Sequence, residues 1–371
     1  MKKFLAGMTM AAAVVMTGAS VKAVPLDQAK LDISGIAQIG YAWSEQLGFD
    51  DELDTNRLRL RLKAQPAEHI AFVSQLELTN NVSSAYAPGG TSTAFGANVP
   101  ANAVLNDGFG ADSRIVDLYM VLTYLDWATI LVGQMPTPVS YELNTDEYSL
   151  ETINYSQFVG IANRDRGIGV VAPLTDRTQL ITWLLNGVGG ISGVTNDVDD
   201  RDNYGVMLNF NAMERLNVKA FGNFGNYLDL PGNLGQPATD KAEMDVDAWG
   251  GGFNYSLKGF HMFSEFVQAR ISMDNETTST RLGSQETREW FVNGSYVFPD
   301  TNLQLVLRYD RYDPDTDTDS DESKITTVGL NWDFEKNARV QLMREFKSGP
   351  VNVLGRDPED DKTMLQLSVR F

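Results

Sequence analysis

The chain has 371 residues, no cysteine and a formal net charge of −19, from 49 acidic and 30 basic residues. The lack of cysteine excludes a disulfide framework and a thiolate metal site. A chain this acidic repels nucleic acid, so we expect no nucleic-acid partner. After the N-terminal segment, no stretch approaches the ~20 apolar residues that a membrane-spanning helix needs.

The first 23 residues have the layout of a secretory signal peptide. Lys2 and Lys3 form a basic start, residues 4–15 are apolar, and Val21-Lys22-Ala23 is a small-x-small cleavage site. We therefore predict an exported protein whose single mature domain is residues 24–371. Loss of the three lysines in this segment takes the formal net charge from −19 to −22.

Segments that alternate apolar and polar residues recur along the rest of the chain. This period of two places the two kinds of side chain on opposite faces of a β-strand. We predict sixteen strands, over residues 29–43, 55–65, 68–79, 114–125, 127–134, 165–173, 177–186, 203–213, 216–228, 245–257, 259–272, 286–298, 301–312, 323–334, 337–346 and 361–371.

The connections between these strands are short and long in turn. The tight turns are predicted at residues 66–67, 126, 174–176, 214–215, 258, 299–300 and 335–336, and the other connections run to about ten residues or more. Short turns at one rim and long loops at the other are typical of outer-membrane barrels. The predicted fold is all-β: a 16-stranded antiparallel transmembrane β-barrel.

The second predicted strand, residues 55–65, contains a row of basic residues. Arg57, Arg59, Arg61 and Lys63 alternate with leucines, so the leucine face can lie in lipid and the basic face cannot. We predict that the basic row lines the lumen near the narrowest part of the channel. In the alternative interpretation the row lies higher or lower in the lumen, is held by acidic neighbours and does little to selectivity.

The third long connection, residues 135–164, begins with Pro136-Thr137-Pro138, which stiffens its departure from the strand. A loop of about 30 residues is usually functional. We predict that it folds into the barrel and narrows the lumen. Its carboxylates would then face the basic row and create a transverse field that sets ion selectivity. These carboxylates are Glu142, Asp146, Glu147 and Glu151.

Four acidic runs fall on the long-loop side, at residues 45–54, 197–202, 313–322 and 357–361. The densest, 313–322, has Thr318 where a calcium-binding EF-hand loop needs glycine, so we expect no EF-hand. We predict either weak binding of Ca²⁺ or Mg²⁺ that bridges these loops to lipopolysaccharide, or a solvated acidic rim.

The chain ends in an alternating strand, Lys362 to Phe371. It resembles the C-terminal signature of bacterial outer-membrane β-barrels, which end in such a strand with a final Phe. We expect it to pair with the first strand, residues 29–43, because a closed barrel leaves no sheet edge.

Several short motifs resemble the phosphate-selective porin O/P family. They are Arg57-Leu58-Arg59-Leu60-Arg61-Leu62 with residues 72–78, Asp117-Leu118-Tyr119, Val132-Gly133-Gln134-Met135-Pro136, residues 163–169, and Val328-Gly329-Leu330-Asn331-Trp332. The resemblance implies a passive channel of the Gram-negative outer membrane, a homotrimer, and a third loop inside the lumen. Asp117 and Tyr119 are therefore added to the predicted pore-lining residues. The family often has a Lys where Pro136 stands here.

The predicted function is a porin that lets small hydrophilic solutes and ions diffuse through the outer membrane, with a possible preference for anions such as phosphate. Its partners would be outer-membrane lipid and lipopolysaccharide. The alternatives are a non-channel structural or adhesive barrel, and an enzyme embedded in a barrel. The catalytic motifs G-x-S-x-G and H-E-x-x-H are absent. We predict that His69 and His261 are interfacial residues, not catalysts, and that the protein is not an enzyme.

Overall fold

The computed structural model describes residues 30–44, 52–78, 115–156, 164–186, 203–230, 242–275, 280–349 and 361–371. The predicted signal peptide, residues 1–23, lies outside these described residues. Within them, no helix is long and apolar enough to cross a membrane.

The described residues form sixteen β-strands and one short 3-10 helix, η2. The strands are β1 Lys30–Ser44, β2 Glu52–Ala67, β3 Ile70–Glu77, β4 Ile115–Leu125, β5 Ala128–Pro136, β6 Arg164–Thr175, β7 Thr178–Leu185, β8 Asn203–Met213, β9 Leu216–Leu230, β10 Ala242–Leu257, β11 Phe260–Asn275, β12 Thr280–Val297, β13 Leu303–Asp313, β14 Ser323–Glu335, β15 Ala338–Ser348 and β16 Lys362–Arg370, and η2 is Glu147–Ser149. Every predicted strand is present; β8 has the predicted ends, and the ends of the others are shifted.

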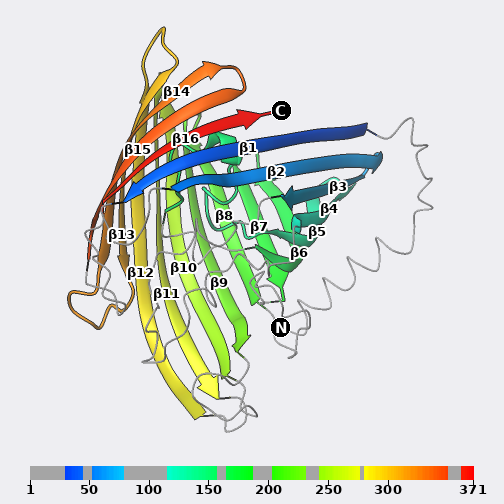
Figure 1. The fold of residues 1–371 in the computed structure, drawn as a ribbon. Helices are drawn as coiled ribbons and strands as arrows, with labels where there is room; N and C mark the ends of the chain where they lie inside the picture. The colour runs from blue at the N-terminus through cyan, green and yellow to red at the C-terminus, as the bar shows by residue number, and fades with distance from the viewer. Residues whose placement is uncertain are drawn as a thin grey trace.

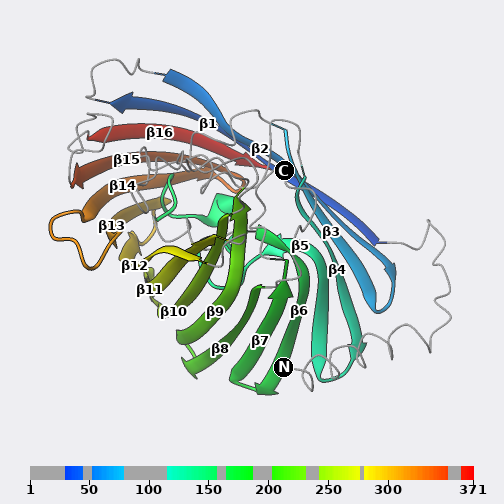
Figure 2. The ribbon, with the colours of Figure 1, turned by 90° about the horizontal axis from the view of Figure 1, so that it is seen from below.

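The strands close into one antiparallel barrel in which each strand pairs with its neighbours in the sequence, and β16 pairs with β1. The register of this last pair runs from Ile36 opposite Arg370 to Ser44 opposite Lys362. Figure 1 shows β1 and β16 side by side, and Figure 2 shows the ring of strands. The predicted 16-stranded antiparallel barrel is confirmed.

The seam between β1 and β16 includes the last residue of the chain. The Phe371 N–H donates to the Gly35 carbonyl at 3.1 Å, and the Gly35 N–H donates to the Phe371 carbonyl at 2.9 Å. A Cβ on Gly35 would lie 2.4 Å from Cζ of the Phe371 ring. Position 35 is therefore occupied by glycine because the terminal ring covers it.

The faces of the strands are inverted relative to a soluble protein. On β16, Leu365 and Leu367 are exposed on the outer face, whereas Gln366 and Ser368 are buried on the inner face. On β13 the inward-facing Arg308 is buried and Leu307 is exposed. An apolar outside and a polar inside is the arrangement that a bilayer requires of a barrel wall.

The tight turns lie at one rim. Lys258 and Gly259 join β10 to β11 with φ values of 45° and 84°, the left-handed conformations that suit a two-residue hairpin. At the other rim two connections are shorter than predicted: residues 45–51 join β1 to β2, and the connection between β11 and β12 is shorter still. β11 continues to Asn275 and β12 begins at Thr280, so only residues 276–279 join them. The missed ends of these strands are mostly polar in sequence, as at Asp274 and Asn275, and lack the apolar–polar alternation on which the prediction depended. Figure 1 shows β10–β12 projecting beyond their neighbours.

Candidate channel constriction

Residues 137–163 join β5 to β6 and are called loop three here. Its described part, residues 137–156, bonds to strands on opposite sides of the barrel, from β2 and β3 to β11, β12 and β13. A segment that reaches opposite walls of a closed barrel must lie inside it. Figure 2 shows the segment that carries η2 within the ring of strands. The predicted inward-folded third loop is confirmed.

Loop three has local structure of its own. The Asn144 side chain donates to the carbonyls of Thr137 and Ser140, each at 2.8 Å. The Asp146 carboxylate accepts from the Tyr148 N–H at 3.0 Å and caps η2, as short polar side chains do at helix starts. These hydrogen bonds lie within the loop and stabilise its conformation in addition to its contacts with the wall.

Arg308 of β13 is the most buried anchor of the loop, with a side chain 1 % exposed. It donates to the Thr152 hydroxyl at 2.7 Å and to the backbone carbonyl of residue 154 at 2.8 Å. It also pairs with Asp310 at 2.8 Å and with Glu142 of the loop at 3.3 Å. Such a charge is tolerated in the interior because it is paired and its donors are satisfied.

The Glu151 carboxylate binds side chains from three strands of the wall, β11, β12 and β13. Its carboxylate lies 2.9 Å from His261 Nδ1, and accepts from Ser295 at 2.6 Å and Gln304 at 2.9 Å. Its backbone carbonyl accepts from Asn331 at 2.9 Å. The prediction for His261 is corrected: it points inward and holds the loop, in contact with Asn254 at 3.0 Å. His69 lies at the β2–β3 turn, with its ring centroid 5.2 Å from that of Tyr124.

Glu147 meets the basic row of β2. Its carboxylate accepts from Arg59 and from Gln75 at 3.1 Å, while Arg59 also pairs with Glu77 at 2.7 Å. Burial opposes ionisation of Glu147, but the charges of Arg59, Arg57 and Arg164 outweigh it and lower the pKa of this carboxyl to about 2. The loop is therefore held to β2 by ionised groups.

Three tyrosines of the loop, seven residues apart in the sequence, lie against three parts of the wall. Tyr141 packs on Phe263 of β11, with ring centroids 4.8 Å apart. The Tyr148 ring lies under the guanidinium groups of Arg339 on β15 and Arg370 on β16. The centroid of the Tyr155 ring lies 5.6 Å from the Arg57 guanidinium carbon. Arginine over an aromatic face is attractive.

The basic row divides into two halves. Arg57 and Arg59 are buried; Arg57 donates to Gln38 at 3.1 Å, and Arg59 binds the loop. Arg61 and Lys63 are exposed. All four share the face on which Arg59 meets the loop, since alternate residues of a strand lie on one face. Only Arg61 and Lys63 therefore present their charges to water.

Asp117 and Tyr119 of β4 lie in register with this row, across β3. Gln75 lies opposite both Arg61 and Asp117, and Tyr119 lies opposite Val73. Asp117 pairs with Arg164 of β6 at 2.8 Å and is buried. Both residues are thus on the inner face, but the Asp117 charge is compensated.

The four predicted loop carboxylates do not form one row facing the water. Glu142 is 1 % exposed and accepts from the Ser156 N–H at 2.8 Å, and Glu147 and Glu151 bond to the wall. Asp146 is exposed. Carboxylates that repeat along a loop have no fixed direction, because the loop lacks the period of a strand.

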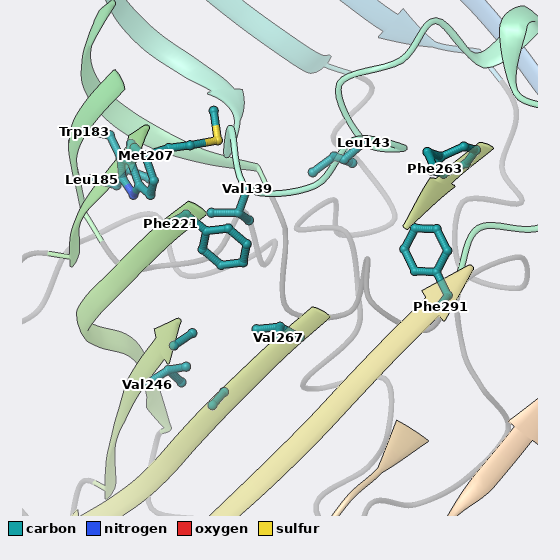
Figure 3. Packing of buried hydrophobic residues seen from close by; sticks show 12 residues of the cluster. Val139, Leu143, Trp183, Leu185, Met207, Phe221, Val246, Phe263, Val267 and Phe291 are labelled. Atoms are coloured by element: carbon teal, nitrogen blue, oxygen red, sulfur yellow. The ribbon is translucent and has the colours of Figure 1, made fainter. Parts of the chain in front are cut away.

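An apolar patch on the inner wall was missed by the sequence analysis. Val139 and Leu143 of the loop pack on it, and Figure 3 shows these side chains. Its wall residues are Trp183, Leu185, Met207, Phe221, Val246, Ala248, Phe263, Val267, Ala269 and Phe291. The signal in the sequence was the loss of alternation in β7, where both faces are apolar.

A pair of charges next to this patch was also missed. Lys219 of β9 binds Glu265 of β11, and its ammonium group donates to the Val139 carbonyl at 2.6 Å. The Glu265 carboxylate accepts from the Tyr141 N–H at 2.6 Å. These bonds fix the first part of loop three to the wall opposite β2.

The acidic segment 313–322 forms a turn in which Asp315 accepts from the Thr318 hydroxyl at 3.0 Å. Glu322 pairs with Arg311 and, at 3.0 Å, with Lys324. Within the described part of the chain, no three His, Cys, Asp or Glu side chains converge as a metal site. Weak binding of Ca²⁺ or Mg²⁺ at the acidic loops stays a prediction.

Residues 5–347 match the family model of the Gram-negative porins. This chain belongs to the Gram-negative porin family. Family and fold place this porin in the outer membrane. The match is to Gram-negative porins in general, and membership of the phosphate-selective porin O/P family stays a prediction. The comparison with curated proteins gave no match.

Three of the solved structures with the same fold are described here. The trimer form of OmpT, an outer membrane protein of Vibrio cholerae, is 12% identical, with a TM-score of 0.58 over 92% of this chain and 99% of that one. The anion-selective porin of Comamonas acidovorans is 13% identical, with a TM-score of 0.57 over 92% and 99%. OmpF of Salmonella typhi, in complex with daunomycin, is 14% identical, with a TM-score of 0.60 over 94% and 100%. At these identities the likeness concerns the fold.

Proposed function

We propose that this porin forms a water-filled channel for passive diffusion of small hydrophilic solutes and ions, with a preference for anions. The preference for anions is supported by one observation: near loop three most acidic side chains are bonded to the wall, while two basic side chains are exposed. Of the four loop carboxylates, Glu142, Glu147 and Glu151 are bonded to the wall and Asp146 alone is exposed, whereas both Arg61 and Lys63 are exposed on the inner face.

Compensated and exposed charges act differently on a passing ion. A carboxylate bound to an arginine presents little net field to water, while an exposed cation attracts anions. Salt screens exposed charges beyond about 8–10 Å, so acidic residues farther than this from the constriction act weakly on an ion there. Local positive charge at the constriction therefore outweighs the negative charge of the whole chain in this proposal.

Phosphate is the anion that the sequence motifs suggest. Guanidinium groups bind phosphate oxygens in a fork geometry, and the inner face of β2 carries three arginines. Pro136, at a position where the resembled family often has Lys, removes one cation. We propose small inorganic anions as the substrate class, with phosphate as a member of it.

A homotrimer is the proposed assembly. It is supported by the trimer form in which OmpT of Vibrio cholerae was solved and by the resemblance to trimeric porins. The three copies would each contain a complete barrel, since all sixteen strands come from one chain.

The test is the reversal potential of reconstituted protein in a potassium chloride gradient. Native protein is expected to prefer chloride. The double variant Arg61→Gln, Lys63→Gln is expected to lose several-fold in the anion-to-cation permeability ratio. Arg177→Gln, which removes an exposed cation at the short-turn rim, is the matched control and should behave as native.

Three results would count against the proposal. A native reversal potential in the double variant would exclude the exposed half of the basic row as the source of selectivity. Chloride current that phosphate does not reduce would exclude a phosphate preference. Folded protein that never conducts would favour the structural or adhesive barrel.

A further inference from the structure

We propose that Arg370, the penultimate residue of the chain, is a selectivity and positioning residue of the constriction. This assignment deepens the proposed anion channel and rests on it. The last strand of the barrel would then close the wall and also supply a charge to the solute pathway.

The direction of the Arg370 side chain follows from the alternation of β16. Leu365, Leu367 and Val369 are exposed on the outer face, and Gln366 and Ser368 are buried on the inner face. Arg370 continues the inner set. Its guanidinium carbon lies 4.7 Å from the centroid of the Tyr148 ring, which is part of η2 inside the barrel.

Arg339 of β15 lies against the same ring and differs from Arg370 in its charge balance. Its guanidinium carbon is 5.4 Å from the Tyr148 centroid, and it makes two bonds to Asp333, at 2.6 and 2.9 Å. It also donates to the Tyr148 carbonyl at 3.2 Å. Arg370 is exposed, and among the described residues it has no ion-pair partner. The charge of Arg339 is therefore compensated, and that of Arg370 faces water.

The strand register brings Arg370 next to the basic row. Ile36 of β1 lies opposite Arg370 on one side and opposite Arg59 on the other. Neighbouring strands are ~4.8 Å apart, so the two arginines stand about 10 Å apart across the seam. Arg59 of β2 binds Glu147, and Arg370 of β16 covers Tyr148. Two consecutive residues of η2 therefore contact the two strands that flank β1.

This arrangement gives Arg370 two physical effects. Its charge adds to the positive potential that Arg61 and Lys63 create on the inner face. Its stacking on Tyr148 restrains η2, because a cation over an aromatic ring is attractive. Removal of the side chain should weaken the preference for anions and loosen the loop, while a lysine at position 370 should preserve the charge.

The experiment compares Arg370→Gln and Arg370→Lys with native protein and with Arg177→Gln as the control. Folding is checked first by the heat-dependent shift of the barrel in gel electrophoresis. In a potassium chloride gradient, Arg370→Gln is expected to lower the anion-to-cation permeability ratio roughly twofold. Arg370→Lys and Arg177→Gln should keep the native ratio.

A second variant tests the positioning effect without touching the last strand. Tyr148→Leu removes the ring that Arg370 covers, so the open-channel current noise should rise at least twofold. If Arg370→Gln does not assemble, Tyr148→Leu still tests the restraint on η2 that Arg370 shares with Arg339, and native noise in it would overturn the positioning role.

The role of Arg370 and the anion selectivity of the channel can be refuted separately. A native ratio in Arg370→Gln, together with a lowered ratio in Arg61→Gln, Lys63→Gln, would overturn the role of Arg370 alone. A native ratio in both would overturn the anion selectivity proposed for the inner face, and the role of Arg370 with it.

Discussion

Arg308 shows how a single residue can hold a loop inside a channel. It is surrounded by Asp310, Glu142 and the Thr152 hydroxyl, and its side chain is 1 % exposed. The guanidinium group satisfies two backbone carbonyls of the loop as well. Its function is therefore different from that of Arg61, although both arginines point into the barrel.

Replacement of Arg308 by Leu should destabilise the barrel. The change leaves the buried carboxylates of Asp310 and Glu142 without their cation, which typically costs about 3–5 kcal/mol. The expected result is a lower temperature for the loss of the folded form in detergent. Arg344→Leu is the control, because Arg344 pairs with Asp361 near the long-loop rim and is one-third exposed. Equal melting of the two variants would contradict the assignment.

Glu147 makes the docking of the loop dependent on pH. Its pKa is lowered from 4.5 to about 2, so its stabilising contribution is complete above about 4.5 and is lost as the pH falls through about 2. We expect quiet native channels at pH 7 and pH 4, and noisy ones below about pH 2. Glu147→Gln should already be noisy at pH 7. Single-channel recording tests this, and a quiet variant at pH 7 would refute it.

At the scale of elements, the seam of β1 and β16 depends on a glycine that the terminal ring covers. Gly35→Val would place a branched side chain where the Phe371 ring lies. Deletion of Phe371 would remove the ring and the two backbone bonds to Gly35. Both changes should reduce the amount of assembled barrel, and the barrels that form should conduct as native ones do.

Gly294→Val is the matched control for this seam. Gly294 is also in a strand, β12, and nothing lies within 4 Å of a Cβ added there. The amount of folded protein in isolated outer membranes is the measurement. Equal yields from Gly35→Val and Gly294→Val would show that the ring contact does not matter for assembly.

The strands were predictable from the sequence because lipid and water act on alternate residues. In β13, Leu305 and Leu307 alternate with Val306 and Arg308, and the structure has them on opposite faces. The partners of loop three were not predictable. Glu151 meets side chains from β11, β12 and β13, and only the register of a closed barrel brings these strands to the same point. The end of β11 was missed because Asp274 and Asn275, its last two residues, are both polar and break the alternation.

At the scale of the whole molecule, the lumen is divided by loop three between two different walls. The apolar patch of β7–β12 holds the first part of the loop, and the arginines of β2, β15 and β16 hold η2. Hydrophobic contact and charge pairing therefore fix the same loop from opposite sides. Solutes would pass along the charged side, since the apolar side is packed.

The proposed trimer gives a prediction of its own. Each barrel contains a complete set of strands and a complete loop anchor, so three copies should insert together and conduct independently. Planar bilayers should show insertion in one step and closure in three equal steps. Single closing steps together with a monomer mass in mild detergent would contradict the trimer.

The seam has a consequence for leakage during biogenesis. Arg370 reaches the Tyr148 ring only when β16 has joined β1, because the register of that pair sets its position. A chain whose last strand is still unpaired has neither a sealed wall nor a finished filter. The step that closes the wall is therefore also the step that places Arg370 over Tyr148, so a closed barrel without this contact has no separate lifetime.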